Sequence, residues 1–317
     1  MPRAPQIAGR HWIMVTLLGM IWGGSFLFTE IALRGVSPYW LVAYRMGIAA
    51  GLSFIIWGGS GWTLFTTQER SYLPLLMITL LNAAVPFTLI SWGQQHVSSG
   101  FAGVSMAAVG LFVLPLAHVL VPGEKINAKT LCGFLIGFGG VLLLIGGRAF
   151  QSSGSELEWY GRLVCLCAAA CYAVNSIFTR KLAPINSLGL VAVPLIGGAL
   201  FTSSFALIYS GPPTALDRPT LSALILLAIF PTTFAAYLRD GLIRSAGPVF
   251  MSLSNYMVPV WSVIFGIILL NESLSLPLIL ALLLILFGTL LSQIDALKSL
   301  FSNSQAETVK SPDHKPP

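Results

Sequence analysis

The sequence predicts an all-α polytopic membrane protein with ten transmembrane helices arranged as two inverted five-helix repeats. Three observations lead to this prediction: a shortage of charge, ten apolar stretches, and an internal similarity between the two halves of the chain. Of 317 residues, 56% are hydrophobic and 9% are charged, and the mean hydropathy is +0.83. Because a soluble domain carries roughly 25% charged residues, this chain has too little charge to cover a surface in water.

The composition also argues against several other classes of protein. Its high hydrophobicity excludes intrinsic disorder, and four cysteines in so long a chain exclude a disulfide scaffold. The net charge of +6 does not indicate nucleic-acid binding, because 17 lysines and arginines spread along the chain form no basic face. We therefore expect two partners, the lipid bilayer and a small-molecule substrate, and no nucleic acid.

The apolar stretches are each close to the roughly 20 residues that a spanning helix needs. Short turns rich in glycine and proline, such as Gly58–Gly61 and Gly211–Pro213, separate them. A signal peptide explains the first stretch less well, because it is too long and no cleavage site follows it. The predicted spans are Trp12–Leu33, Pro38–Trp57, Tyr72–Trp92, Ser99–Val121, Thr130–Gly146, Trp159–Arg180, Ser187–Tyr209, Thr220–Leu238, Ala246–Leu270 and Pro277–Ile294.

The distribution of positive charge predicts that both termini are cytoplasmic. With that orientation the inner segments hold 12 of the 17 lysines and arginines, the outer segments hold 4, and Arg45 lies within a span. Positive residues concentrate on the cytoplasmic side of membrane proteins. The predicted organisation is a cytoplasmic N-terminus (1–11), a first repeat (12–146), an outer linker (147–158), a second repeat (159–294) and a disordered cytoplasmic tail (295–317).

The two halves resemble each other at a nearly constant offset. The pattern Trp22-x-x-Ser25-x-x-x-Thr29 recurs as Tyr172-x-x-Asn175-x-x-x-Thr179, an offset of 150 residues. Gly100 and Gly247 match at an offset of 147, and Glu124 and Glu272 at 148. Since five spans are an odd number, the second half must enter the membrane in the opposite orientation. Inverted repeats of this kind are typical of alternating-access transporters.

Prolines predict helix interruptions at corresponding places in the two halves. The third span contains Asn82 and Pro86, and its counterpart, the eighth, contains Pro231 before two threonines. The fourth span contains Pro115 and the ninth contains Pro259. Interrupted helices in matching positions mark the binding site in many transporters, although a proline can also be a packing kink without a role in ligand binding.

Several of these residues together resemble a known family. The stretch Leu18–Phe26, Pro38 and Arg45, and Pro122–Glu124 followed by Gly133, resemble an EamA-type repeat; Gly247, Pro259 and Glu272 repeat parts of the pattern. The resemblance extends from about Trp12 to Gln293. It implies the drug/metabolite transporter superfamily, with ten helices in two inverted repeats and secondary transport of small metabolites, commonly outward.

Two ionisable residues lie clearly inside the predicted spans, where charge is costly and therefore a candidate for function. Glu30 and Arg45 approach a similar depth on consecutive helices, so one interpretation is an ion pair that fixes the first hairpin. Glu30 can equally reach Arg34, one turn on. The functional interpretation is that Glu30 takes up a proton, or that the pair contacts a charged substrate.

Polar and aromatic residues in the spans predict the lining of a cavity, because amides and phenols bind solutes without a buried charge. Interhelical hydrogen bonding is an equal alternative for Asn175 and Asn255. A separate group, Tyr237, Arg239 and Asp240, is either a cytoplasmic gate or a set of interfacial anchors. The predicted substrate-binding residues are Trp22, Ser25, Asn82, Tyr172, Asn175, Asn255 and Tyr256.

No motif in the sequence predicts catalysis, a cofactor or a metal site. The cysteines lack metal-ligand spacing, and no nucleophile elbow or phosphate-binding loop is present. Gly19-x-x-x-Gly23 and Gly133-x-x-x-Gly137 predict close helix packing, within a monomer or across a homodimer. The predicted function is a secondary transporter in a bacterial inner membrane that exports small metabolites such as amino acids by alternating access, with proton coupling as an option. Alternatives are an uncoupled facilitator, an importer and, less favoured, an intramembrane enzyme.

Overall fold

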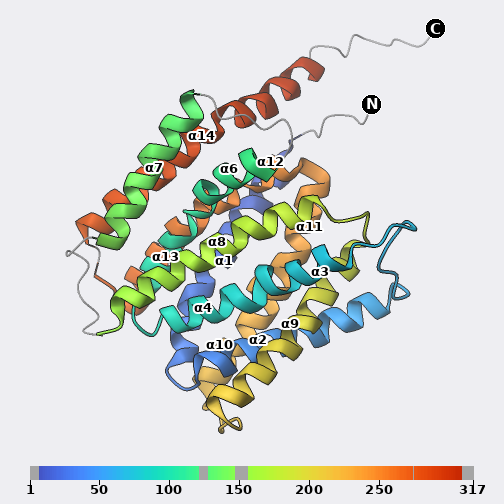
Figure 1. The fold of residues 1–317 in the computed structure, drawn as a ribbon, viewed down its shortest axis with the longest axis vertical. Coiled ribbons are helices and arrows are strands. Elements are labelled where there is room, and N and C mark those ends of the chain that lie inside the picture. Colours follow the sequence, from blue (N-terminus) through green and yellow to red (C-terminus); the bar gives the residue numbers. More distant parts are fainter. Residues whose placement is uncertain (1–6, 121–127, 147–155, 274, 309–317) are drawn as a thin grey trace.

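The computed structural model describes residues 7–120, 128–146, 156–273 and 275–308, and Figure 1 shows these as a bundle of long helices. Within these residues the structure contains helices and one isolated antiparallel bridge, between Phe65 and Ile185, but no strand. The Pro122-Gly123-Glu124 segment of the predicted repeat lies outside the described residues.

Among the described residues, eight helical stretches are long and apolar enough to cross a membrane. Their boundaries match the first eight predicted spans to within three residues, except that the eighth continues from Leu238 to Ala246. The stretches are α1 (Gly9–Leu33), α2 (Pro38–Gly58), α3–η1–α4 (Tyr72–Thr79, Leu80–Ala84, Val85–Gly93), α5–α6 (Ser99–Met106, Val109–Leu120), α7 (Ala128–Gly146), α8 (Glu158–Arg180), α9 (Ser187–Ser210) and α10–η2–α11 (Arg218–Leu227, Ala228–Phe234, Ala235–Ala246).

The ninth and tenth predicted spans hold shorter apolar helices. α12 (Pro248–Met251) and α13 (Ser254–Leu270) share the ninth position, and the break between them leaves α13 with 17 residues. The apolar part of α14 (Leu276–Thr308) covers Leu276–Ser292. The helix then continues to Thr308, whereas the sequence predicted a disordered tail from residue 295. Apolar residues spaced three and four apart after residue 295, such as Leu297, Leu300 and Phe301, continue the helical pattern.

Local sequence explains where several spans begin. The Ser37 side chain caps α2 by accepting a hydrogen bond from the Trp40 N–H, and Pro38 occupies the first helical position. The Asn186 side chain caps α9 and that of Asp217 caps α10. A capped start satisfies backbone N–H groups that the helix leaves without partners.

The third and eighth spans both contain a π-helical segment, at matching positions. η1 lies directly before Pro86, and η2 contains Pro231. A proline cannot donate to the carbonyl four residues earlier, so the helix widens locally and bonds run from residue i to i−5. The Val85 N–H donates to Leu80 O in this way. The interruptions predicted in these two spans are confirmed.

The fourth and ninth spans are broken by short turns of the 3₁₀ type. In the fourth, the Ala107 N–H donates to Val104 O; in the ninth, the Leu253 N–H donates to Phe250 O. The sequence placed these interruptions at Pro115 and Pro259, but both prolines lie inside continuous helix, α6 and α13, about two turns after the break. A proline in the membrane removes one backbone bond without ending the helix, because neighbouring groups satisfy the freed carbonyl.

Helices far apart in the sequence pack in corresponding pairs. α7 lies along α14 and α2 lies along α9, as Figure 1 shows. α1 packs against the eighth and ninth spans, and α8 packs against the third and fourth. The contacts of α1 with the eighth and ninth spans therefore correspond to those of α8 with the third and fourth.

Glycines permit the closest of these contacts. A Cβ on Gly133 would lie 2.5 Å from the Gly288 carbonyl oxygen, and a Cβ on Gly23 would lie 2.5 Å from the Trp261 Cβ. Both glycine motifs identified in the sequence thus serve packing inside one chain.

The segments that connect the spans are joined by hydrogen bonds at two opposite ends of the bundle. At one, called here the Ser99 end, the Ser37 hydroxyl bonds the Ser210 hydroxyl and Glu272 bonds Ser99. At the other, the Leu64 end, the Asn186 N–H donates to Leu64 O.

The outward faces of the helices are strongly apolar. Side chains such as Ile55 (71% exposed), Leu200 (69%) and Ile268 (68%) would contact water in a soluble protein. Apolar surface this extensive requires lipid around it. The structure is therefore that of an integral membrane protein.

Candidate functional site

Arg45 is the most deeply buried charge among the predicted site residues. Its Nε donates to the Thr232 hydroxyl at 2.7 Å, and its guanidinium carbon lies 3.8 Å from the centre of the Phe87 ring. Only 5% of the residue is exposed. The side chain therefore links the second span to η2 in the eighth and to α4 in the third.

Thr232 is a link between this arginine and the backbone of η2. While it accepts from Arg45, its hydroxyl donates to Leu227 O, five residues earlier. Thr233 makes the equivalent bond to Ala228 O. The carbonyls that the π-helical turn leaves open are thus closed by hydroxyls, as expected where a helix is irregular inside a membrane.

Glu30 lies near Arg34, one of its two predicted partners, and does not pair with the other, Arg45. Its electrostatic neighbours are Arg34 and Glu272, and no ion pair joins Glu30 to Arg45 in the described part of the chain. Of the two predicted partners, Arg34 is the one near Glu30, because both lie toward the Ser99 end while Arg45 turns toward η2. The two charges occupy separate environments.

Asn82 and Asn175 join the two halves directly. The Asn175 side-chain nitrogen donates to Asn82 Oδ1 at 3.2 Å, across the boundary between η1 and α8. The Asn175 oxygen is buried and has no hydrogen-bond partner. Interhelical bonding is therefore present, and one acceptor of the pair stays open. Tyr172, one turn earlier on α8, is within electrostatic reach of Arg45.

The first-span residues Trp22 and Ser25 make contacts that stabilise the packing of their own helix. The Ser25 hydroxyl donates to Trp22 O at 2.6 Å, which uses its proton within its own helix. Trp22 packs against two hydrophobic clusters, one around Phe101 and the other around Phe250. The repeated motif also recurs in detail: Thr29 donates to Ser25 O, and Thr179 donates to Asn175 O.

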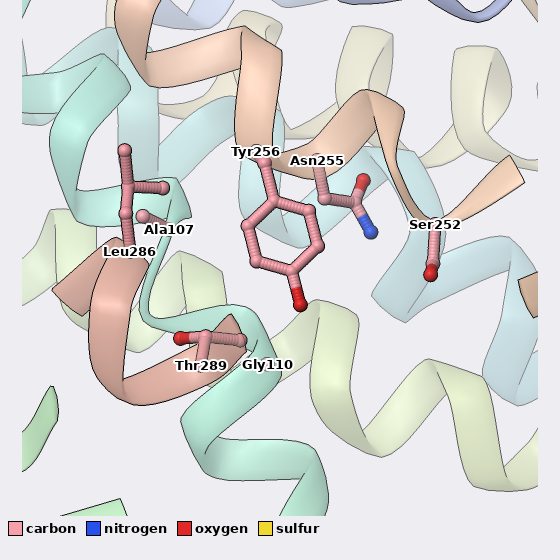
Figure 2. Close-up of a pocket in the computed structure, with 7 residues that line it drawn as sticks. All are labelled: Ala107, Gly110, Ser252, Asn255, Tyr256, Leu286 and Thr289. Atoms are coloured by element: carbon pink, nitrogen blue, oxygen red, sulfur yellow. The ribbon is translucent and has the colours of Figure 1, made fainter. Parts of the chain in front are cut away.

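Asn255 and Tyr256 lie at a second place, a hollow beside the breaks in the fourth and ninth spans. Figure 2 shows Tyr256 with Asn255 beside it, and Gly110 and Thr289 on the side toward which the tyrosine ring extends. The Tyr256 hydroxyl is buried and has no hydrogen-bond partner, whereas the Thr289 hydroxyl donates to Ile285 O. The residues that line the hollow are Ala107, Gly110, Ser252, Asn255, Tyr256, Leu286 and Thr289.

The predicted gate residues lie on α11, toward the Leu64 end. Asp240 forms an ion pair at 3.0 Å with Arg244, one turn along the same helix. Tyr237 faces Ser53 of α2, but neither hydroxyl has a hydrogen bond of regular geometry. Arg239 has Asp240 as its electrostatic neighbour. Because the ion pair stays on one helix, it does not itself connect two parts of the bundle.

Six of the predicted site residues thus form two groups. One joins Arg45, Tyr172, Asn82 and Asn175 across the second, third, sixth and eighth spans. The other, Asn255 and Tyr256, belongs to the hollow beside the fourth, ninth and tenth spans. Sequence reasoning missed Phe87 and did not single out Thr232 as a contact of Arg45; the Pro231 interruption was the available signal for Thr232.

The geometry defines a class of protein: a bundle of membrane helices with paired interruptions and polar groups facing its interior, as in transporters. The EamA-like transporter family model matches the chain twice, over residues 10–146 and 159–293. The chain belongs to the EamA-like transporter family, and the resemblance noted in the sequence is confirmed.

Relatives described as uncharacterized transporters are similar along most of their length. One from Archaeoglobus fulgidus is 27% identical over 82% of this chain and 89% of its own. YoaV of Bacillus subtilis is 25% identical (87% and 93%), and the inner membrane transporter YedA of Escherichia coli is 27% identical (86% and 87%). One crystal structure matches in fold, with a TM-score of 0.65 and 19% identity over 92% of this chain and 99% of that one. The chain is a membrane transporter.

Proposed function

We propose that this chain is a secondary transporter that exports small metabolites, such as amino acids, across the bacterial inner membrane by alternating access. The observation that carries the proposal is the matching pair of breaks in the fourth and ninth spans, beside a hollow with an unpartnered tyrosine hydroxyl. Broken helices expose backbone groups that a solute can bind. YedA, named as an inner membrane transporter, supports this location.

An inverted repeat of ten spans is part of the proposal. The double match to the family model supports a duplication, and the paired π-helical segments and paired contacts of α1 and α8 support equivalent halves. With both termini cytoplasmic, the Leu64 end faces the cytoplasm and the Ser99 end faces outward.

The substrate, in this proposal, lies between the halves and contacts both groups of polar residues. Asn175 Oδ1 and the Tyr256 hydroxyl support this placement, because each is buried without a partner and a polar solute would satisfy it. Trp22 supplies an apolar wall beside them. Tyr237, Arg239 and Asp240 lie on the cytoplasmic side of this path, where they would act as a gate.

Transport by the purified protein in liposomes tests the proposal. The assay offers labelled amino acids, nucleosides and sugars, with and without a pH gradient. We expect amino acids to move, and Asn82→Ala and Tyr256→Ala each to reduce the rate at least tenfold while the protein stays folded. Tyr209→Phe, on an exposed tyrosine, is a control that keeps the wild-type rate. Transport at the wild-type rate by both alanine variants would contradict the placement of the substrate.

Glu30 is the proposed site of proton coupling, because it is the half-buried carboxylate of the first span and is separate from Arg45. Glu30→Gln should remove the dependence of transport on the pH gradient while facilitated movement persists. If the wild-type protein shows no such dependence, the chain is an uncoupled facilitator. Equal dependence in both proteins would place coupling elsewhere.

A further inference from the structure

The buried positive charge of Arg45 has no negative partner among the described residues. Arg45 is the eighth residue of α2, which at 1.5 Å per residue places it about 10 Å from the start of the helix. A charge at this depth is costly unless it is paired. Its contacts are a neutral hydroxyl and an aromatic ring, from Thr232 and Phe87.

The terminal nitrogens of this guanidinium are available for a ligand. Arginine has five N–H donors in a planar fork, and the one hydrogen bond that Arg45 makes to a described residue uses Nε. Thr232 and Phe87 fix the plane of the group through Nε and through one of its faces. The two terminal nitrogens form the edge that binds a carboxylate with two parallel hydrogen bonds.

None of the acidic side chains that the structure describes fills this position. Glu30 lies near Arg34, and the Glu272 carboxylate accepts hydrogen bonds from the N–H groups of Ser99 and Gly100. The electrostatic neighbour of Arg45 on α8 is a neutral phenol, that of Tyr172. About one turn further along the same helix, the neutral amide of Asn175 bonds that of Asn82. The site therefore has one fixed cation and a set of neutral polar groups.

We propose that Arg45 binds a carboxylate group of the transported solute, which supplies the counter-charge that this buried guanidinium lacks. This inference rests on the proposed transport function and narrows its substrates to solutes that carry a carboxylate. It assigns to Thr232 and Phe87 the role of positioning residues, because they hold the guanidinium without contacting the solute.

Ligand protection against thermal unfolding of the detergent-purified chain tests this inference without requiring transport. The probes are the twenty amino acids, lactate and succinate, each compared with its carboxamide where one exists, such as L-alanine with L-alaninamide. We expect at least one carboxylate to protect the wild-type protein with an affinity about 10- to 100-fold above that of its amide. Arg45→Gln should remove this preference, and Arg45→Lys should keep part of it.

Three further variants distinguish recognition from a purely structural role of Arg45. Thr232→Val keeps the charge but removes the bond to Nε, so it should weaken carboxylate binding severalfold. Arg70→Gln is the matched control, because Arg70 also lies over a phenylalanine ring but is exposed. It should leave the preference unchanged. Phe65→Leu, which removes the ring under Arg70, should also leave it unchanged.

The outcomes separate this inference from the proposed function. Suppose that the protein prefers carboxylates in an Arg45-dependent way but transports no labelled solute in liposomes. This result would support the site and reject export. Transport of amino acids and their amides at equal rates, unchanged in ratio by Arg45→Gln, would reject the site and leave transport intact. The absence of protection by every carboxylate probe would also reject the site.

Discussion

Glu272 binds Ser99 across the boundary between the two halves of the chain. Its carboxylate accepts the Ser99 N–H at 2.7 Å and the Gly100 N–H at 3.0 Å, at the start of α5. Negative charge at a helix start satisfies open donors and interacts favourably with the helix dipole. The contact is close because Gly100 and Gly266 have no Cβ: one on Gly266 would lie 2.5 Å from Glu272 Oε2. It ties the fourth span to the end of the ninth.

Replacing Glu272 should loosen the Ser99 end. Glu272→Ala removes two hydrogen bonds to a charged acceptor, each worth about 1.5–3 kcal/mol, so we expect a loss of stability in that range or somewhat above. Thermal unfolding in detergent measures it. Glu69→Ala, on an exposed loop, should change stability by less than about 0.5 kcal/mol. A melting temperature for Glu272→Ala equal to that of Glu69→Ala would show that the contact contributes little.

The contact between α7 and α14 predicts a sharp difference between two glycine substitutions. A Cβ on Gly288 would lie 2.4 Å from the Gly133 carbonyl oxygen, a backbone atom that cannot move aside alone. Gly288→Ala should therefore push the helices apart and destabilise the protein by about 1–3 kcal/mol or more. Gly139, on α7, has open space where its Cβ would lie.

Gly139→Ala is thus a matched control, because it makes the same change in the same helix pair without a clash. It should be neutral or slightly stabilising, since alanine favours a helix by up to about 1 kcal/mol over glycine. Thermal unfolding of the two variants side by side provides the comparison. If both variants were destabilised equally, the effect would come from replacing any glycine in these helices and not from the contact between Gly288 and Gly133.

Some of this arrangement was readable from the sequence, and some was not. Span boundaries such as Pro38 and Ser99 were predictable, because uninterrupted apolar stretches and turn residues mark them locally. The contact between Arg45 and Thr232 joins residues 187 apart in the chain. No local pattern sets the relative rotation of two helices, so the expected Glu30–Arg45 pair was inferred from depth alone and the rotation of α2 directs Arg45 elsewhere.

The break positions show a similar limit. Prolines identified the correct spans, since each removes a backbone hydrogen bond. Yet the fourth span breaks at Ala107 and Ala108, and the ninth at Ser252 and Leu253. These residues are compatible with uninterrupted helix, so no local signal marks the turns; α5 and α13, which adjoin the two breaks, pack against each other. The hollow of Figure 2 is set by these turns and was foreseen only through Asn255 and Tyr256.

The start of α10 predicts a dependence of stability on pH. The Thr220 side chain and backbone N–H hydrogen-bond the carboxylate of Asp217, which lowers its pKa below the usual value. A lowered pKa in the folded state contributes stability above the unfolded value, near 4, and this is lost as the pH falls through the folded value. Wild-type stability should therefore decline at acidic pH more steeply than that of Asp217→Asn.

The asparagine variant keeps a capping oxygen but cannot titrate, so it isolates the charge. Melting temperatures of both proteins between pH 7 and about pH 3 give the comparison, and the difference between them should shrink as the pH falls below 4. The effect will be small because Asp217 is exposed to solvent. Parallel profiles over the whole range would show that the cap acts through geometry without charge.

Opposite orientation of the two halves gives the most direct test of the proposed architecture. Glu124 and Glu272 are matched at an offset of 148 residues, each after the fourth span of its half. In an inverted repeat the segments that follow them face opposite sides of the membrane. In a background without the four native cysteines, Asn127→Cys should react with an impermeant thiol reagent only from the cytoplasmic side, and Asn271→Cys only from the outside. Labelling in intact cells and in inverted vesicles distinguishes the two. Reaction of both cysteines from one side would rule out inversion, and with it the alternating exposure of a solute between two equivalent halves.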